Sequence, residues 1–340
     1  MARTNHELTN DGAGLIRHIS VCLDRSPLGD RLVPHAVALA NAFGAKLTLL
    51  NSLEPPHDHS DTMPTDPLEW EIQRSQARKH LAAVESEHSS ADLAVVTEVL
   101  EGRPAEEIRD WVSCHAVDLV VLGSHGASGW TEWSLASTAR KLIEGIPRSI
   151  LLVPAWSVQE PLKHDVTYDR VLVLLDGSLR AESALPAALR IARSHGSDLI
   201  LLHVVPRPES SCPCPLDEDE HDLDQRLIDR NTRAAQVYLE EVRKHVMGDG
   251  LRVRTVVAVD GDVRSEILRR VAADHIDLLV FSGHGSGGRG ELPFGSVAGF
   301  LLEHATVPLL VIRDRIAQKS RALARSRSRG GARLPQLADS

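Results

Sequence analysis

The sequence predicts an α/β fold of two tandem, doubly wound domains, each built on a five-stranded parallel sheet. Two observations carry this prediction. Short apolar runs alternate with helical patterns along the chain, which is typical of parallel strands covered by helices on both faces. A glycine-rich turn also occurs twice, 159 residues apart, as His125-Gly126 and His284-Gly285. With 340 residues, the chain is long enough for two domains of ordinary size.

The first repeat alternates strands and helices in a regular order. An apolar run that ends on Asp24 opens it, and the following helix pattern gathers its aliphatic residues on one face before Gly44 ends it. Pro104 stands near the first turn of a later helix, where proline is favoured. We predict strands at 18–24, 46–53, 93–100, 118–123 and 149–153, and helices at 28–43, 68–88, 104–115 and 137–145.

The second repeat matches the first element by element. Asp176 follows Asp24 by 152 residues, whereas Gly285 follows Gly126 by 159. About seven extra residues therefore lie between the second and third strands, and we expect them in or near the loop at 206–222, because loops absorb insertions at small cost. We predict strands at 170–176, 198–205, 252–259, 277–281 and 308–312, and helices at 181–195 and 297–304.

Charge and composition limit the class of protein. The formal net charge is −9, yet the stretch from Arg313 to Ser340 holds seven Arg and one Lys against two Asp. The acidic body argues against a general nucleic-acid binder, and a basic, Ser-rich end is most often solvated. No apolar run approaches the roughly 20 residues that cross a bilayer. We therefore expect a cytoplasmic protein without membrane contact, divided into a disordered leader (1–14), domain 1 (15–154), a linker (155–168), domain 2 (169–313) and a disordered basic tail (314–340).

Both acids and both glycine turns are predicted at one edge of each sheet. Asp24 and Asp176 end the first strand of each repeat, and each turn follows the fourth strand. Ligands of doubly wound sheets bind at the carboxyl ends of the strands. Glycines let the backbone approach a ligand, and the helix after each turn offers unpaired N–H groups at the positive end of its dipole. The sequence therefore predicts an anion site in each repeat that needs no basic side chain.

These residues resemble the universal stress protein family over nearly the whole chain, from His18 to Arg313. The family signature is Gly, two residues, Gly, nine residues, Gly, then Ser or Thr. The resemblance implies a Rossmann-like, adenine nucleotide α-hydrolase-like fold that binds ATP, either alone or together with Mg²⁺. It implies that the acid and the end of the second strand hold the ribose and adenine, and that the turn holds the phosphates. The residues implied are Asp176, Val204, Gly283, His284, Gly285, Gly295, Ser296 and Val297 in domain 2, and Asp24, Gly123, Gly126, Ser137 and Thr138 in domain 1.

Neither repeat matches the signature completely. Domain 1 has Ala136 in place of the third glycine, and domain 2 has Ser282 in place of the first. If the third position needs a positive φ, an alanine there costs about 1–2 kcal/mol, or roughly tenfold in affinity. Asp176-Gly177-Ser178 also looks more like the ATP-binding members than Asp24-Arg25-Ser26 does. We therefore expect domain 2 to be the better ATP site and domain 1 the weaker one.

Motifs of other nucleotide-binding and hydrolase folds fit less well. Gly283 to Gly288 satisfies the dinucleotide fingerprint G-x-G-x-x-G, but it follows a fourth strand rather than a first. The chain has no P-loop, and Ser286 does not stand in G-x-S-x-G. His125 and His284 could contact phosphate or serve acid–base chemistry. We predict no catalytic residue, and ATP hydrolysis, if present, is expected to be slow.

Two polar loops after the second strands raise a metal hypothesis. His57, Asp58, His59 and Asp61 cluster in one loop, and Cys212, Cys214 and His221 cluster in the other. Imidazole and thiolate ligands suit zinc, but Cys-x-Cys lacks the spacing of a structural site, so no metal site is predicted. The remaining cysteines, Cys22 and Cys114, are predicted to be small core residues.

The expected function is ATP binding, used as a regulatory state in the stress response. The alternative is a nucleotide-free module that recruits an unknown protein partner through its loops and basic tail. A third interpretation, a slow ATPase or adenylyl transferase, is weakest because the H-x-G-H and S-G-G-x-D-S motifs of related enzymes are absent. The resemblance also implies that the domains pair as an intramolecular pseudo-twofold dimer through their fifth strands, 149–153 and 308–312, with a homodimer left open.

Overall fold

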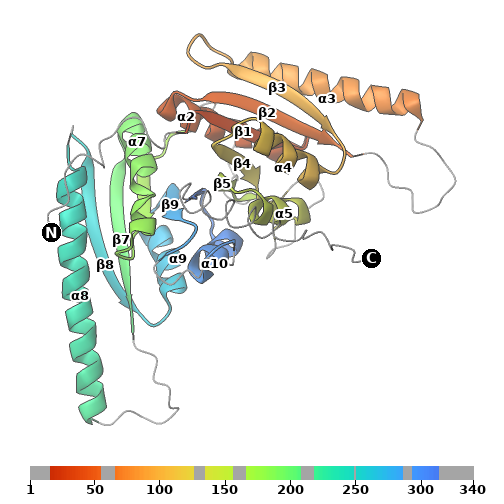
Figure 1. The fold of residues 1–340 in the computed structure, drawn as a ribbon. Helices are drawn as coiled ribbons and strands as arrows, with labels where there is room; N and C mark the ends of the chain where they lie inside the picture. Colours follow the sequence, from red (N-terminus) through yellow and green to blue (C-terminus); the bar gives the residue numbers. More distant parts are fainter. Residues whose placement is uncertain are drawn as a thin grey trace, which may run out of the picture.

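The computed structural model describes residues 16–54, 66–125, 135–155, 166–207, 218–248, 250–285 and 293–313. Strands and helices alternate through both halves of the chain (Figure 1). Domain 1 contains β1 (His18–Leu23), α1 (Pro27–Asp30), α2 (Leu32–Phe43), β2 (Lys46–Leu53), α3 (Pro67–His88), β3 (Val95–Glu101), α4 (Pro104–Cys114), β4 (Leu119–Gly123), α5 (Ser137–Gly145) and β5 (Ser149–Val153). Domain 2 contains β6 (Arg170–Leu174), α6 (Leu179–Glu182), α7 (Leu185–His195), β7 (Asp198–Pro206), α8 (Glu218–Val246), β8 (Arg252–Asp260), α9 (Val263–Ala273), β9 (Leu278–Ser282), α10 (Ser296–His304) and β10 (Leu309–Ile312).

The ten described strands form one sheet in the order β3-β2-β1-β4-β5-β10-β9-β6-β7-β8. Within each domain all neighbouring strands are parallel. β5 and β10 pair antiparallel across the domain boundary, with Leu309 opposite Leu152 and Val311 opposite Ile150. The predicted fold class and the predicted pairing of the fifth strands are therefore confirmed, and the two parallel sheets are continuous.

Helices cover both faces of this sheet, so its strands are buried on both sides. Successive residues of β4 alternate between two cores: Leu119 and Val121 face one, and Val120 and Leu122 face the other. The first core is closed by α2, α3, α7 and α8, and the second by α4, α5, α9 and α10. Each core contains residues of both domains, so the two domains share their hydrophobic interior.

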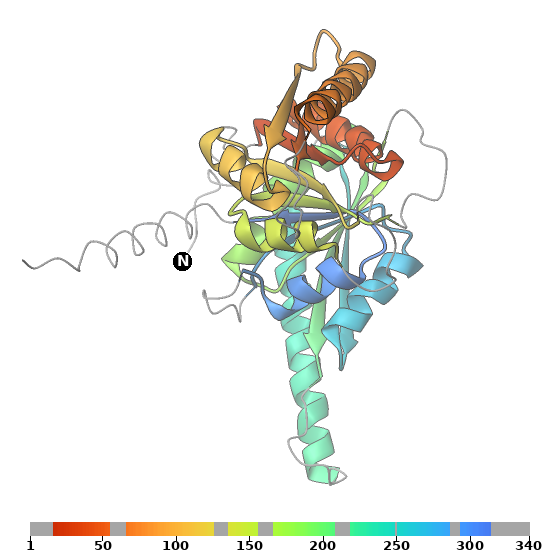
Figure 2. The ribbon, with the colours of Figure 1, turned by 90° about the vertical axis from the view of Figure 1, so that its right-hand side faces the viewer.

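The length of α8 shows that the end of the predicted loop at 206–222 is helical. It has 29 residues, seven more than the 22 of α3 at the same place in domain 1. The extra residues lengthen a helix rather than a loop. Figure 2 shows the early part of α8 extending well beyond the sheet.

None of the helices that the structure describes is both long and apolar enough to cross a membrane.

Cys22 and Cys114 were both predicted to be core residues, and the structure contradicts this prediction for Cys114. Cys22 on β1 is partly buried against the second core, as expected. Cys114 is exposed at the end of α4. That helix buries Ile108 and Val112, which stand four residues apart on one face, and Cys114 lies on another face.

Tyr168 joins the two domains on one face of the sheet. The sequence places it in the linker, yet its side chain is only 1% exposed. Its hydroxyl lies 2.9 Å from Nδ1 of His35 on α2, and its ring stacks on His195 of α7. Its backbone N–H donates a hydrogen bond of 3.0 Å to Nδ1 of His195. Nearby, the Nε of Arg190 donates to the carbonyl oxygen of Ala42 across the same boundary at 2.7 Å.

Arg313 joins the domains on the other face. Its two terminal guanidinium nitrogens donate to the carbonyl oxygens of Ile143 and Ile146 at the end of α5, each at 2.6 Å. The guanidinium also lies over the ring of Phe294, 4.3 Å from its centroid. A cation near the C-terminus of a helix stabilises its dipole, so the residue that follows the last strand of domain 2 caps a helix of domain 1.

Acid is expected to weaken the fold through His35. Burial lowers the pKa of its imidazole from 6.5 to about 4. Above pH 6.5 the imidazole is neutral in both states, but between pH 6.5 and 4 the unfolded chain binds a proton that the folded chain does not, so the free energy of unfolding falls by up to about 3 kcal/mol. Urea unfolding at pH 7 and pH 4.5 measures this loss. His35→Gln, which cannot titrate but can still pair with the Tyr168 hydroxyl, should lose much less; an equal loss would contradict the assignment.

Candidate functional site

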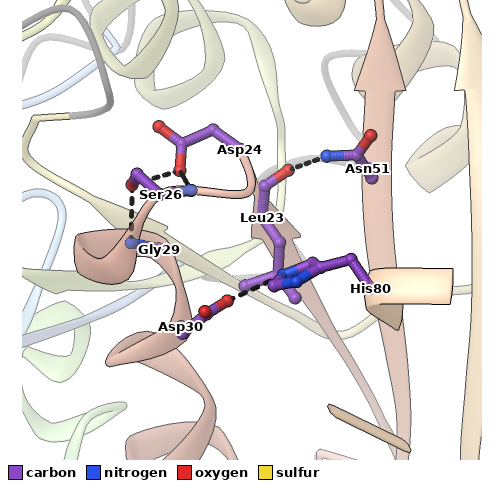
Figure 3. A network of polar contacts seen from close by, with 7 residues as sticks. All are labelled: Leu23, Asp24, Ser26, Gly29, Asp30, Asn51 and His80. Carbon is purple, nitrogen blue, oxygen red and sulfur yellow. Dashed lines mark hydrogen bonds and ion pairs between the residues drawn. The ribbon is translucent and has the colours of Figure 1, made fainter. Parts of the chain in front are cut away.

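The carboxyl end of β1 is organised around Asp24 (Figure 3). Its Oδ1 accepts hydrogen bonds from the backbone N–H of Ser26, at 3.1 Å, and from the Ser26 hydroxyl. The Ser26 oxygen in turn accepts from the N–H of Gly29 at 3.0 Å and caps α1. A Cβ at position 29 would lie 2.5 Å from Asp24 Oδ1, so glycine is what allows this close approach. The carboxylate is therefore held in place at the sheet edge.

The second strand supports the same edge. Nδ2 of Asn51 donates to the carbonyl oxygen of Leu23 at 2.8 Å (Figure 3). Leu23 is paired with Asn51 in the parallel register, which puts Asp24 level with Ser52 on the neighbouring strand. The end of the second strand thus stands beside the acid, as the family resemblance implies.

A hollow of about 320 Å³ opens beside Asp24. The ends of β1, β2 and β4 and the first residues of α4 and α5 surround it. Its lining includes the predicted domain 1 residues Asp24, Gly123, Ser137 and Thr138, together with His125 and Ser52. The structure therefore brings four of the five predicted residues of domain 1 to one concave site.

Ser124 closes the turn between β4 and α5. Its side chain is buried, and its hydroxyl oxygen accepts from the N–H of Ala155 and contacts Nδ1 of His125, both at 3.0 Å. Its carbonyl oxygen accepts from the N–H of Ala136 at 2.9 Å, immediately before α5. The start of α5 is thereby anchored to the end of the sheet, with its first residues beside the hollow.

The conformation of Ala136 removes one of the two grounds for the predicted ranking of the two domains. Ala136 has φ −53° and ψ 145°, and Gly295 at the matching position has φ −71° and ψ 165°. Both are extended conformations that any residue adopts, so the alanine carries no strain from a positive φ. The same hydrogen bond closes both turns, from Ala136 to Ser124 and from Gly295 to Gly283, at 2.9 Å in each case. At this position the backbone therefore gives no reason to rank domain 1 below domain 2. The other ground remains, because Arg25 has φ 61° where Gly177 has φ 80°, and glycine takes this left-handed conformation without strain.

In domain 2 the predicted residues also meet at one edge. Oδ1 of Asp176 accepts from the N–H of Ser178 at 3.0 Å. A Cβ at Gly285 would lie 2.3 Å from Oδ2 of Asp176, so the glycine turn lies directly against the acid. Leu174 pairs with Leu202, which puts Val204 level with Asp176. Ser296 and Val297 begin α10 just beyond Gly295, so the eight residues predicted for this domain, which also include Gly283 and His284, gather at the carboxyl ends of β6, β7 and β9.

The polar side chains around the site differ between the two domains. His203 stands 152 residues after Asn51, and burial lowers the pKa of its imidazole although the charge of Asp176 acts to raise it. Tyr238 on α8 donates a hydrogen bond of 3.1 Å to Glu182, where domain 1 has a contact of 2.9 Å between His80 and Asp30. The common fold therefore carries two chemically distinct sites.

A larger hollow, of about 490 Å³, lies at the opposite edge of domain 2. Its arginines start strands β6 and β8 and are paired with acids or carbonyls. Arg252 pairs with Asp198, Arg254 lies 2.8 Å from the carboxylate of Asp274, and Arg170 donates to the Asp274 carbonyl oxygen at 3.1 Å. Since these contacts already use the arginines and none of the predicted site residues is in its lining, size alone does not make it the functional site.

Some predicted features lie outside the described residues, and others were missed. Gly126 and the loop residues His57, Asp58, His59, Asp61, Cys212 and Cys214 fall outside. Among the residues that the structure does describe, no group of three or more His, Cys, Asp or Glu is placed to hold a metal.

Three residues that line the hollow of domain 1 were not predicted from the sequence. One is Ser52, although the 152-residue offset from Val204 would have identified it. The others are Pro104 and Ile108 of α4, which line the hollow without any motif to mark them.

Comparisons with known proteins agree with this architecture. A family model described as "Universal stress protein family" matches residues 15–154 and again 167–313. A universal stress protein of Mycolicibacterium smegmatis is 25% identical over 305 residues, covering 87% of this chain and 97% of its own length. The solved structure of a universal stress protein from Archaeoglobus fulgidus, 18% identical, covers 87% of this chain and 96% of its own with a TM-score of 0.60. A universal stress protein solved in complex with cAMP is 18% identical and covers 42% of this chain and 98% of its own, with a TM-score of 0.32.

Proposed function

Because the chain belongs to the universal stress protein family, in tandem form, we propose that it is a regulatory protein that binds an adenine nucleotide. The observation that carries the proposal is the hollow of about 320 Å³ in domain 1, whose lining includes the acid of β1 and the first residues of α5. A concave site of this size with a few converging polar groups is the usual form of a small-molecule site.

The chemistry around the hollow supports this ligand class. Asp24 offers a fixed carboxylate to the hydroxyls of a ribose, and the half-buried Ser52 stands level with it at the end of β2. The start of α5, with the hydroxyls of Ser137 and Thr138, offers N–H and O–H donors to a phosphate. One ligand could therefore span the acid and the helix start.

We propose domain 2 as a second site, for ATP, on the contacts of Asp176 with the turn at Gly285. Nucleotide occupancy would act as a signal rather than as a step of turnover, because the residues at both sites are binding groups. The role in the stress response is proposed from family membership alone. The same holds for a protein partner. The competing function is a nucleotide-free module that recruits a partner protein.

Isothermal titration of the full chain with AMP and with Mg-ATP tests the proposal. Chromatography of whatever the purified protein releases on denaturation should accompany it. We expect at least one adenine nucleotide bound per chain, in the micromolar to millimolar range. If neither nucleotide binds at millimolar concentration and none is released, the proposal fails and the partner-recruiting module takes its place.

A further inference from the structure

We infer that the outer side of α8 pairs with the same side of a second copy of this chain, as two antiparallel helices. The inference goes beyond nucleotide binding and does not depend on it. Two features of the helix carry it. One is a row of exposed apolar side chains, and the other is a row of charges beside it that matches itself when the helix is turned end for end.

The helix α8 lies at the outer edge of domain 2 (Figure 1), and among the described elements it packs chiefly on β7 and β8. The side that faces the sheet carries Leu239, Val242 and Val246, which belong to the first core. The early part of the helix continues beyond the sheet (Figure 2). The far side of α8 therefore points away from the body of the protein.

An apolar row runs along this outer side. Leu223, Leu227, Ala234 and Val237 are spaced by four, seven and three residues, which places them on one narrow face of the helix. The side chains of Leu223, Leu227 and Val237 are 67%, 40% and 60% exposed, and Ala234 is exposed as well. Isolated apolar residues are common on protein surfaces. A row with this spacing is instead typical of the seam between two paired helices.

A row of charges borders the apolar row on the side that points away from the sheet. From the start of the helix to its end the charges alternate between acid and base, in the order Asp222, Arg226, Asp229, Arg233, Glu240 and Lys244. Contacts within the helix already join some of them, such as the ion pair of 2.6 Å between Asp222 and Arg226. Exposed pairs of this kind contribute little to stability, so their charges remain available to a second helix.

This row is complementary to itself in one orientation. When Leu227 of one copy is level with Val237 of the second, each charge comes within about 3 Å, along the helix axis, of the level of an opposite charge, at a rise of 1.5 Å per residue. The facing pairs are Asp222 with Lys244, Arg226 with Glu240, and Asp229 with Arg233, and twofold symmetry forms each pair twice.

The orientation and the occupant follow from this pattern. In a parallel pair, each charge of the row would lie beside the same charge of the other copy, and like charges repel. In the antiparallel pair all the facing charges are opposite, and such flanking charges set the orientation and the choice of partner in paired helices. Since one helix supplies both halves of every pair, the occupant that fits this side of α8 is a second copy of the chain.

Sedimentation velocity of the full chain tests the pairing. From about 1 µM to about 1 mM protein, we expect a reversible equilibrium between monomer and dimer. Val237→Lys places an ammonium group in the apolar seam of each copy and should raise the dissociation constant at least about tenfold. Lysine favours a helix more than valine does, so the fold should be kept. Ile72→Lys on α3, where the side chain is 48% exposed, is the matched control and should leave the dissociation constant unchanged.

A charge exchange tests the orientation. Arg226→Glu sets an acid against Glu240 of the second copy and should weaken the dimer about tenfold at low salt. Adding Glu240→Arg to the same chain restores opposite charges and should return the dissociation constant to within about threefold of its original value. The two positions are 14 residues apart, or about 21 Å along one helix, so a rescue of this kind acts between copies rather than within one.

Each outcome supports or overturns the pairing. Tenfold weakening by Val237→Lys and by Arg226→Glu, with rescue by Glu240→Arg, supports it. A chain that stays monomeric throughout the range overturns it and leaves the outer side of α8 to a different protein. A dimer that Val237→Lys does not weaken, or that the charge exchange does not restore, is formed in another way and also overturns it. Circular dichroism of every variant checks that the helices are kept.

Discussion

Ser52→Phe is expected to abolish nucleotide binding in domain 1. Ser52 lines the hollow at the end of β2, level with Asp24, and a phenyl ring there would occupy space that the ligand needs. Affinity for AMP should fall by at least about 100-fold, which corresponds to about 2.7 kcal/mol. Calorimetry and tryptophan fluorescence with the full chain measure the loss, since all five tryptophans precede domain 2.

Two matched variants serve as controls for Ser52→Phe. Ser52→Ala removes a weak hydrogen bond, 3.4 Å from the Ser52 hydroxyl to the carbonyl oxygen of Gly102, and should leave the hollow open. Val204→Phe makes the same change at the matching position of domain 2 and should spare the tryptophan signal. A Ser52→Phe protein that folds and still binds AMP with unchanged affinity would show that the ligand lies elsewhere.

Tyr168→Ala is expected to lower the free energy of unfolding strongly. The ring of Tyr168 is fully buried between α2 and α7. Truncating a large buried aromatic residue costs about 3–5 kcal/mol, because it leaves a cavity that the surroundings fill only in part. Since Tyr168 touches both domains, the variant should also weaken their docking.

Chemical denaturation followed by circular dichroism measures this cost. Tyr168→Phe keeps the ring and removes only the hydroxyl, which leaves Nδ1 of His35 without that partner, so it should cost about 1–2 kcal/mol. The difference in unfolding free energy between Tyr168→Ala and Tyr168→Phe gives the contribution of the packing of the ring. A loss below about 1 kcal/mol for Tyr168→Ala would show that the domains do not depend on this contact.

The sequence was sufficient for the fold class because the signals were repeated. Apolar strands alternate with helices, and Asp24 and Asp176 mark the same strand end in both copies. The position of the glycine turns after the fourth strands then places them beside those acids, since parallel strands share one carboxyl edge. Pairing of the fifth strands came from the family resemblance, and the register of Leu309 opposite Leu152 confirms it.

What the sequence could not supply was backbone geometry and long-range packing. A glycine in a motif suggests a positive φ, but Gly295 and Ala136 are both extended, so the inferred penalty does not arise. An acidic stretch with cysteines and prolines resembles a loop, yet its later part starts α8. The burial of Tyr168 depends on His35, 133 residues away, and no local pattern could have revealed it.

A crystal structure of the full chain with AMP would decide whether domain 1 holds a nucleotide between its acid and the start of α5. We predict AMP in the hollow of domain 1, with its ribose at Asp24 and its phosphate beside Ser137 and Thr138. AMP bound in domain 2 alone, or bound in domain 1 with its phosphate turned away from α5, would contradict this prediction.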